Sequence, residues 1–369
     1  MLGVLVTAAA LILSPLVATA QSVATTPQLP LTQNGGTWDS GHVQGIAVDV
    51  QGGYIYYSFT NLLAKYDFSG KLIGTLVGWT GHLGDLDFNP ADGKVYGSLE
   101  YGKDKAFYIA VIDVKQLDRV GVDASKTGTF RTVYLPEVVK DYVAERYGCS
   151  GIDGVGFGPA FGHVDGPRYL TVAYGVYSNT ERGDNDHQVL LQYDVSDWHN
   201  YAKPLNEADL HHSGPSKLQG KYFARTGNTT WGVQNLSYDD SLRRWFMGVY
   251  QGKKPSFPNY LLFAIDARTQ STMRNLVGVA SADGKGAERG QLLELADDGL
   301  KDAATGVRGW NQKADVGFQP VGPDRSGHAL FYLSANSGSK GAQSSDLTLM
   351  RWTGEANQPF VPVTTQEIR

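Results

Sequence analysis

The sequence predicts an all-β protein built as a single β-propeller, and three observations lead to this prediction. The chain of 369 residues holds 45 glycines and 20 tyrosines but only 4 methionines and 1 cysteine, a composition that favours turns and strands over long helices. Short apolar segments recur along the chain, each bounded by Gly, Asp, Asn or Pro. One segment pattern also recurs with a unit of about 40 residues, the length of a four-stranded propeller blade.

The N-terminal segment has the pattern of an export signal. Residues 2–17 are apolar but are too short and too interrupted to span a bilayer, and Ala18-Thr19-Ala20 supplies the small residues of a cleavage site. A buried N-terminal strand is the alternative interpretation. We expect a secreted, extracellular protein without a membrane anchor, divided into a signal peptide (1–20), a flexible lead (21–34) and one catalytic propeller domain (35–369).

Nine segments are predicted to be strands because β-branched and aromatic residues alternate in them between turn residues. Their flanking Gly, Asp and Asn residues supply the tight turns that join antiparallel strands. In chain order these segments are 54–59, 94–99, 107–114, 168–174, 188–195, 244–250, 260–266, 329–334 and 347–352. One short helix is predicted over 136–146, where Pro136 occupies the first turn and Glu137 follows it.

The repeat consists of segments 42–49, 82–89, 151–158 and 232–239, with a looser fifth copy near Val316. Aligning the first four on Gly45, Asp85, Gly154 and Asn235 gives separations of 40, 69 and 81 residues. The separation of 69 fits one blade plus an insertion that holds the helix. If the longest separations each hide one degenerate blade, the propeller has seven blades, which is the preferred count. Five longer blades are the alternative, because fewer strands are visible than seven blades need.

Composition excludes several classes of function. The formal net charge is −5 and no run of Lys or Arg offers a nucleic-acid surface. Cys149 stands alone, so neither a disulfide within the chain nor a structural zinc site is expected. No cofactor is required. Asp184-Asn185-Asp186 resembles half of a calcium loop, so a bound calcium ion stays open beside the simpler interpretation as a surface turn. We expect a monomer.

Candidate site residues follow from the repeat, because the loops that enter the innermost strands of a propeller share one face. His42 and His82 occupy the same position of adjacent units, so we expect their imidazoles to lie side by side. Polar and aromatic residues in Gly-bounded loops around them suit a polysaccharide or oligosaccharide substrate, although such residues also simply make turns. The expected substrate-binding residues are Arg225, His187, Asn228, Gln234, Asn235, Tyr250 and His211.

Six of these segments together resemble a group of secreted propeller proteins, the L-rhamnose-α-1,4-D-glucuronate lyases that act on gum arabic and related arabinogalactans. The segments are HVQG (42–45), GHLG (81–84), YGSLE (96–100), RYGCSGIDG (146–154), DNDHQVL (184–190) and GNTT (227–230). The resemblance implies a polysaccharide lyase that releases L-rhamnose by β-elimination and leaves an unsaturated glucuronate. Such a reaction needs a base, a group that neutralises the uronate carboxylate, and a proton donor. We assign His82 or His42 as the base, Arg146 or Arg225 as the carboxylate clamp and Tyr147 as the donor.

Two alternatives come from other classes. A glycoside hydrolase of the rhamnosidase kind would need two carboxyl groups across the scissile bond, for which Asp85, Asp153 and Glu100 are the candidates. A non-catalytic sugar-binding propeller would show similar pockets in several blades, whereas the segments here differ from blade to blade.

Overall fold

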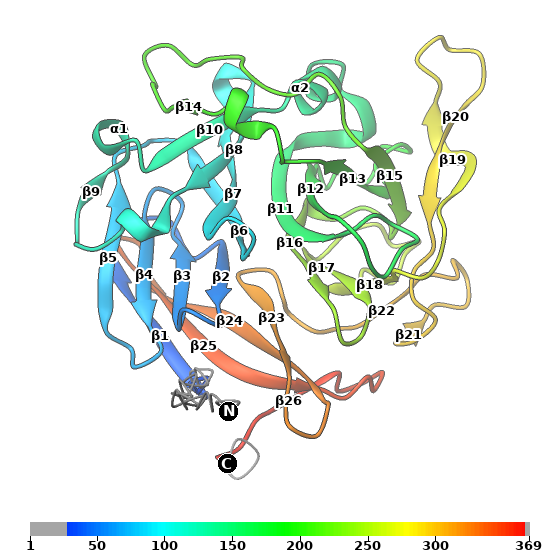
Figure 1. The fold of residues 1–369 in the computed structure, drawn as a ribbon. Helices are drawn as coiled ribbons and strands as arrows, with labels where there is room; N and C mark the ends of the chain where they lie inside the picture. The colour runs from blue at the N-terminus through cyan, green and yellow to red at the C-terminus, as the bar shows by residue number, and fades with distance from the viewer. Residues whose placement is uncertain (1–27, 366–369) are drawn as a thin grey trace, which may run out of the picture.

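A ring of five β-sheet blades surrounds a central axis in the computed structural model, which describes residues 28–365 (Figure 1). The first strand of each blade lies innermost and the following strands pair outward. The five innermost strands are β2 (Gly45–Asp49), β6 (His82–Asn89), β11 (Cys149–Pro159), β16 (Thr230–Asp239) and β23 (Phe318–Pro323). The first four coincide with the repeat segments seen in the sequence, and β23 begins just after the fifth copy.

Blades 1 and 2 are completed by strands that alternate in direction. Blade 1 continues with β3 (Tyr54–Ser58), β4 (Leu63–Asp67), β5 (Leu72–Val77) and the short parallel β9 (Val122–Asp123). Blade 2 continues with β7 (Lys94–Tyr101), β8 (Ala106–Ile112), β10 (Phe130–Tyr134) and β14 (Lys203–Pro204).

Blades 3 and 4 differ greatly in width. Blade 3 continues with β12 (Arg168–Val176), β13 (His187–Tyr193), β15 (Gly220–Arg225), β20 (Ala287–Leu293) and β19 (Thr272–Ala280). Blade 4 contains only β17 (Arg244–Tyr250) and β18 (Leu262–Asp266) beside β16, and the small hairpin of β21 (Leu300–Lys301) and β22 (Arg308–Gly309) lies next to it through a bridge from Leu262 to Trp310.

Blade 5 joins the two ends of the described chain. It contains β24 (Ala329–Ser339), β25 (Ala342–Trp352), β26 (Phe360–Pro362) and the N-terminal strand β1 (Thr32–Trp38), which pairs antiparallel with β25. The flexible lead expected up to residue 34 therefore ends earlier, because residues from Thr32 onward close the ring. The expected signal peptide, residues 1–20, lies outside the described residues.

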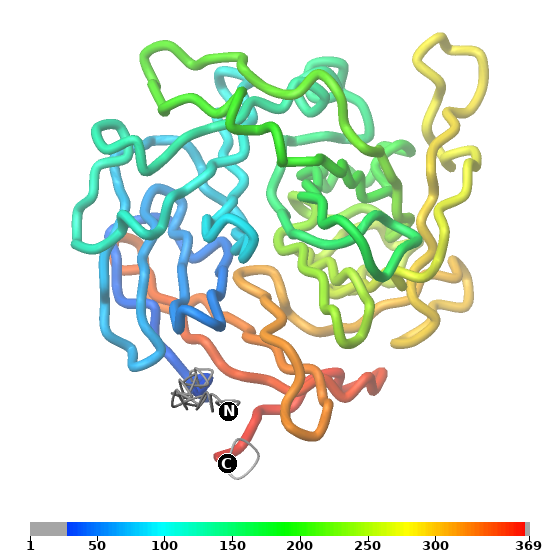
Figure 2. Tube along the Cα trace, viewed as in Figure 1, coloured from blue at the N-terminus to red at the C-terminus, as the bar shows by residue number. Residues whose placement is uncertain are grey.

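The structure has five blades, the second of the two counts that the sequence allowed, and the preferred count of seven is corrected. The long separations hold outer strands of existing blades rather than hidden ones. The chain leaves blade 3 after β13, adds β14 to blade 2 and returns as β15. After blade 4 it returns again to blade 3 as the β19–β20 hairpin, the yellow segment that stands at the edge of the ring in Figure 2.

Helices are few and short. They are α1 (Ala124–Thr127) and α2 (Pro136–Val143), with single 3-10 turns at 102–104, 114–116, 146–148 and 198–200. The second begins at Pro136 as the sequence predicts, and it buries Val138 and Asp141 against blades 2 and 3. No helix within residues 28–365 is long and apolar enough to cross a membrane.

The core consists of apolar layers between neighbouring blades rather than one central mass. Alternating strand residues project into these layers, so each blade is covered on both sides. Between blades 4 and 5, for example, the ring of Phe246 in β17 packs edge to face against Phe318, Phe331 and Trp352, with centroids 5.7, 5.4 and 5.2 Å apart. This wedge-like packing leaves the ends of the innermost strands free to form sites.

Candidate functional site

The innermost strands all run in one direction, which gives the propeller two distinct faces. The hydrogen bonds of Asp85 reach Val155 and Leu236, and those of Asp87, two residues further along β6, reach Phe157, two residues further along β11. We call the face where these strands begin the N-terminal face and the face where they end the C-terminal face. His42, Glu100, Asp153 and Gln234 belong to the N-terminal face.

The axis of the ring is closed between the two faces by Asp85 and Asn235, which are buried. Asp85 Oδ2 accepts the backbone N–H groups of Val155 (3.0 Å) and Leu236 (2.9 Å), and its Oδ1 accepts Asn235 Nδ2 (2.7 Å). Asn235 also donates to Gln44 O (3.0 Å) and accepts the N–H of Gly317 (2.5 Å). These bonds link all five blades. The assignment of Asn235 to substrate binding is therefore wrong, and Asp85 loses its place as a hydrolase carboxylate because both of its oxygens are engaged.

Two histidines from adjacent blades lie together on the N-terminal face. His82 opens β6, and burial, followed by the neighbouring charge of His42, lowers its pKa to about 4. His82 is therefore neutral at pH 7 and able to accept a proton. His42 lies just before β2, and its Nε2 is 3.4 Å from the hydroxyl of Tyr250 at the end of β17. The expected residues Tyr250, His42 and His82 are thus brought to one place.

A pair of carboxyl groups lies on the same face. Glu100, near the end of β7, accepts the backbone N–H of Ile152. The preceding residue, Gly151, has φ +138, and a Cβ added to it would clash with Glu100 Oε1. Burial raises the pKa of Glu100 well above its usual range, and the negative charge of Asp153 adds to this shift. Burial likewise raises the pKa of Asp153 to about 8. The pair therefore holds at least one proton at neutral pH.

Gln234 connects this pair to an exposed aromatic residue. Its Nε2 donates to Asp153 Oδ2 (2.9 Å) and to the carbonyl of Trp231 (2.8 Å). Trp231 is 51% exposed and lies next to Tyr177, which is 40% exposed, with ring centroids 5.8 Å apart. The sequence pattern included Trp231 only as part of a candidate loop, residues 225–235, and did not include Tyr177. Trp231 lies in a Gly-bounded loop, which was a usable signal, but no pattern in the chain marks Tyr177.

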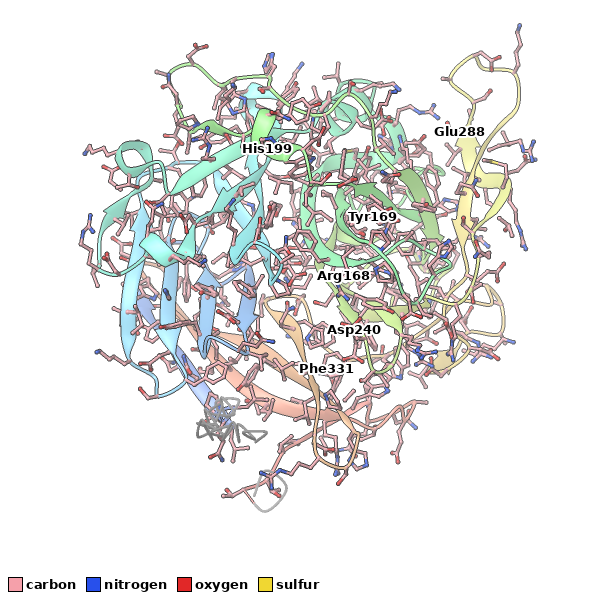
Figure 3. All side chains as sticks on the ribbon, viewed as in Figure 1. Arg168, Tyr169, His199, Asp240, Glu288 and Phe331 are labelled. Atoms are coloured by element: carbon pink, nitrogen blue, oxygen red, sulfur yellow. The ribbon has the colours of Figure 1, made fainter. Side chains whose placement is uncertain are left out.

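Arg146 and Tyr147 lie away from the histidines, so their assigned roles as clamp and donor are corrected. Tyr147 has φ +57, and its buried ring points outward to Phe223 and Lys221 of β15. Its hydroxyl donates to Glu288 of β20, which also forms an ion pair with Arg146. Figure 3 labels Glu288 at the outer edge of blade 3. Both side chains hold the β19–β20 hairpin against blade 3.

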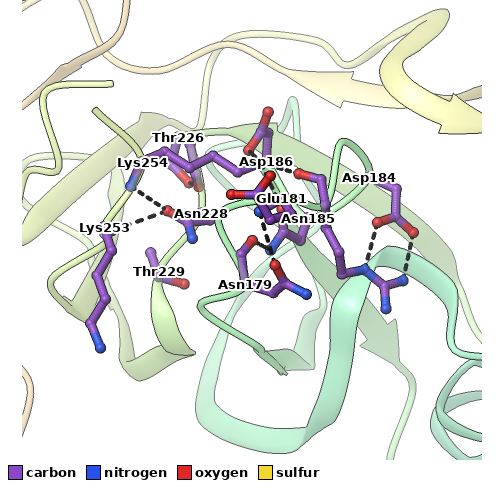
Figure 4. A network of polar contacts seen from close by, with 12 residues as sticks. Asn179, Glu181, Asp184, Asn185, Asp186, Thr226, Asn228, Thr229, Lys253 and Lys254 are labelled. Atoms are coloured by element: carbon purple, nitrogen blue, oxygen red, sulfur yellow. Dashed lines mark hydrogen bonds and ion pairs between the residues drawn. The ribbon is translucent and has the colours of Figure 1, made fainter. Parts of the chain in front are cut away.

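A buried polar network between blades 3 and 4 contains the predicted site residue Asn228 and lies next to two others, His187 and Arg225 (Figure 4). At its centre the ammonium of Lys254 forms an ion pair with Asp186 and donates to Asn185 Oδ1 (2.7 Å). Asn228 Oδ1 accepts the backbone N–H groups of residues 253 and 254, both at 3.2 Å. His187 is buried, and burial followed by the charges of Arg225 and Lys254 lowers its pKa to about 4.

Asn228 is thus part of this network, while His187 Nδ1 and Arg225 Nε lie beside it, buried and without a hydrogen-bond partner, so the contacts of these residues with substrate stay predictions. The guanidinium of Arg225 lies over the ring of Phe257 at 5.4 Å. Both carboxylates of the half calcium loop form ion pairs within the chain, Asp184 with Arg182 (2.7 Å) and Asp186 with Lys254. Within residues 28–365 no group of three His, Cys, Asp or Glu side chains could hold a metal ion.

His211 belongs to a loop that covers the outer part of blade 2. Its Nε2 lies 2.8 Å from Thr132 Oγ1, and its carbonyl accepts the hydroxyl of Tyr108 at 2.8 Å. This position is far from the axis of the ring, since Thr132 is in β10, the fourth strand of the blade. The structure thus does not bring His211 to the histidine pair, and its contact with substrate stays a prediction.

A cavity of about 670 Å³ occupies the C-terminal face. It is lined by the ends of the innermost strands and by Arg168, which pairs with the exposed Asp240 at 2.8 Å (Figure 3). Burial raises the pKa of Asp87 at its base to about 6, but Phe157 N–H (2.6 Å) and Gln319 Nε2 (3.0 Å) occupy its oxygens. We place the candidate site on the N-terminal face, because His82, Glu100 and Asp153 lie there with strongly shifted pKa values, and such groups mark reactive sites better than volume does.

Comparisons with known proteins add little to this picture. No protein-family model and no curated protein matches the chain. Among solved structures, the β-propeller domain of Cps50 (Swd1) from Myceliophteria thermophila is 9% identical with a TM-score of 0.36, and the match covers 88% of this chain and 75% of that one. The Dos1 propeller is 8% identical with a TM-score of 0.33, covering 87% and 81%. Likenesses of this size carry no functional information.

Proposed function

We propose that this protein is a carbohydrate-active enzyme, a lyase that cleaves a uronate-containing polysaccharide by β-elimination. The observation that supports the proposal is the meeting, on one face, of a neutral imidazole at His82, the His42–Tyr250 pair and the protonated pair Glu100–Asp153. The resemblance of segments 42–45, 81–84 and 96–100 to rhamnose-glucuronate lyases points to the rhamnose-α-1,4-glucuronate linkage of gum arabic as the substrate.

The first requirement of the reaction is a base for the C5 proton of the glucuronate. His82 is suited to this role because its pKa of about 4 keeps the imidazole neutral throughout the neutral pH range, with one ring nitrogen able to accept a proton. A base of such low pKa is weak in water. Proton transfer to it becomes feasible only when neutralisation of the neighbouring carboxylate makes the C5 proton more acidic, so the second requirement matters as much as the first.

The second requirement is neutralisation of the uronate carboxylate, because a negative carboxylate opposes formation of the enolate-like intermediate. Arg146 pairs with Glu288 and the guanidinium of Arg225 lies over Phe257, so in this proposal the role passes from these arginines to Glu100 and Asp153. A carboxylic acid that keeps its proton at neutral pH donates a strong hydrogen bond to a carboxylate. The high pKa values of Glu100 and Asp153 supply such a donor.

The third requirement is a proton for the leaving oxygen, O4 of the glucuronate. Burial raises the pKa of the Tyr250 hydroxyl, and His42 Nε2 lies 3.4 Å from it. In the balanced step, His82 takes the C5 proton, the C4–O4 bond breaks and a C4=C5 double bond forms. Tyr250 gives its proton to O4 and L-rhamnose leaves. Tyr250 thus takes the place assigned to Tyr147.

Glycoside hydrolysis is the second candidate function, and the Glu100–Asp153 pair is the observation that favours it. Hydrolases use one protonated and one ionised carboxyl group across the scissile bond, and two neighbouring acids with raised pKa values meet the protonation requirement. In this case the histidines would bind the sugar rather than take part in the reaction.

The purified protein with gum arabic distinguishes the two. Elimination produces an unsaturated uronate whose conjugated double bond absorbs in the ultraviolet, together with free rhamnose. Release of rhamnose without ultraviolet absorption would establish hydrolysis instead, and release of no sugar from any arabinogalactan would reject both. Export is part of the proposal, and mass spectrometry of the mature protein tests it by locating the N-terminus at Gln21 or at Met1.

A further inference from the structure

We propose that Trp231 and Tyr177 form a stacking subsite for a neutral sugar ring, next to the Glu100–Asp153 pair. This inference rests on the proposed carbohydrate substrate. It adds a binding position that neither the repeat nor the resemblance identified, and it names the part of the substrate that occupies it.

The exposure of these two rings is the first observation. Trp231 and Tyr177 are 51% and 40% exposed, while the other exposed large apolar side chains of residues 28–365, at 120, 143, 273 and 277, are not aromatic. The two rings meet edge to face with centroids 5.8 Å apart. Aromatic side chains contribute strongly to stability when buried, so two that lie together in solvent indicate a surface that binds something.

The backbone of Trp231 is the second observation. Its φ is +63, in the left-handed region that bulky residues rarely adopt, and Gly232 follows with φ +79. Such a conformation persists only where neighbours enforce it, and it is often found at ligand sites. Here Gln234 Nε2 holds the carbonyl of Trp231 at 2.8 Å while the same nitrogen holds Asp153 Oδ2 at 2.9 Å. One side chain therefore sets the position of the indole relative to the carboxyl pair.

Tyr177 is supported by the buried network between blades 3 and 4. Asn185 Nδ2 donates to the carbonyl of Tyr177 and to that of Asn179, both at 2.8 Å. The ammonium of Lys254 in turn donates to Asn185 Oδ1 at 2.7 Å (Figure 4). The backbone N–H of Tyr177 donates to Gly148 O at 2.8 Å. The chain around Tyr177 is exposed, but these hydrogen bonds from buried residues hold its backbone in place.

The surroundings of Gly175 show that the aromatic pair, Trp231 and Tyr177, lies next to the carboxyl pair, Glu100 and Asp153. A Cβ added at Gly175 would lie 3.3 Å from the carbonyl oxygen of Trp231 and 3.4 Å from Asp153 Oδ2. Tyr177 is two residues further along the same strand end. A sugar placed over the rings would thus be next to a sugar that reaches Asp153.

The chemistry of the rings selects the ligand. Pyranose rings present C–H groups on their faces, which pack on aromatic rings as apolar surface does. Ring faces carry negative quadrupole charge, so a uronate carboxylate is disfavoured over them and a neutral pyranose is favoured. We therefore assign the subsite to a neutral sugar adjoining the glucuronate.

Affinity gel electrophoresis of the full chain in gels containing gum arabic tests the subsite without requiring turnover. Trp231→Asn removes the ring but retains the backbone conformation, since Asn tolerates positive φ. We expect this change and Tyr177→Ala to weaken retardation roughly 3- to 10-fold. Trp231→Phe should retain much of the binding. Met273→Ala, which alters an exposed apolar residue on β19, is the matched control and should bind as wild type does.

Kinetics separate this inference from the proposed function. If wild type forms unsaturated product, Trp231→Asn should raise KM with kcat within about twofold, because stacking binds substrate and transition state alike. Binding lost in Trp231→Asn with no product from wild type would support the subsite and reject the lyase. An unchanged KM and unchanged retardation in Trp231→Asn, or a wild type that the polysaccharide does not retard, would overturn the subsite.

Discussion

Asn235 Nδ2 donates a hydrogen bond of 2.7 Å to Asp85 Oδ1 across the axis of the propeller, which joins blades 2 and 4 through the centre of the ring. Both side chains are buried, and their remaining bonds reach the other three blades, at Val155 in β11 and at Gln44 and Gly317, which directly precede β2 and β23. The closure of a five-bladed ring thus depends on polar contacts at its centre as well as on the apolar layers between blades.

Asn235→Ala should therefore be strongly destabilising. It removes a donor from a buried carboxylate and leaves Gly317 N–H without its partner, and the expected loss in the free energy of unfolding is at least about 2 kcal/mol. Chemical denaturation monitored by tryptophan fluorescence measures it. Asp240→Asn, at an exposed carboxylate, is the control and should change stability little. An unchanged midpoint for Asn235→Ala would contradict the role of this contact.

Asp153→Asn should stabilise the protein more at pH 8 than at pH 5. The folded pKa of Asp153, about 8, lies above the unfolded value of about 4, so the folded state binds more protons between these values and wild-type stability falls as pH rises through this window. An amide does not ionise, so the variant avoids this loss. We expect a gain of at least about 1 kcal/mol at pH 8.

Denaturation at the two pH values measures this difference. Asp165→Asn, at an exposed position, should show no such dependence on pH. Equal changes in the stability of Asp153→Asn at pH 5 and pH 8 would show that Asp153 is ionised throughout the range.

The pH profile of kcat/KM should follow the same groups. Activity should rise as His82 loses its proton near pH 4 and fall as the Glu100–Asp153 pair loses its proton near pH 8. Asp153→Asn, which keeps a hydrogen-bond donor, should move the alkaline limb upward. An alkaline limb unchanged in this variant would remove the pair from the proposed neutralising role.

His82→Ala should lower turnover by roughly 10²- to 10⁴-fold with little change in polysaccharide retardation, the usual result of losing a general base. His199→Ala is the control, because this histidine is exposed beyond the strands of blade 2 (Figure 3). Full activity in His82→Ala together with loss of activity in Glu100→Gln, without unsaturated product, would replace elimination by hydrolysis.

Arg146→Ala should leave kcat and KM near wild type, in contrast to the clamp role that the sequence alone indicated. Its guanidinium pairs with Glu288 and donates to Ala280 O, so the change should loosen the β19–β20 hairpin. Faster amide exchange in residues 272–293 and a stability loss of about 1 kcal/mol are expected. A large rise in KM would bring Arg146 back to the site.

Local patterns in the sequence were sufficient for nine outer strands and for the innermost strands of the first four blades, but they missed others such as β4, β10 and β15. Alternation between apolar residues and Gly, Asp or Asn turns depends on neighbouring positions only, so β17 and α2 begin where the sequence predicts them. His42 and His82 could also be paired, since they hold one position of a repeat. These are properties that a few consecutive residues encode.

The number of blades and the composition of the site depended on contacts between distant segments. An outer strand joins whichever sheet edge offers free N–H and C=O groups, so β19 and β20 return to blade 3 although they follow blade 4 in the chain. Glu100 meets Asp153, and Tyr250 meets His42, only because the ring brings the ends of their strands together. Burial at that meeting point, which no single segment encodes, raises the pKa values of Glu100, Asp153 and Tyr250, while the rings of Trp231 and Tyr177 lie in solvent beside them.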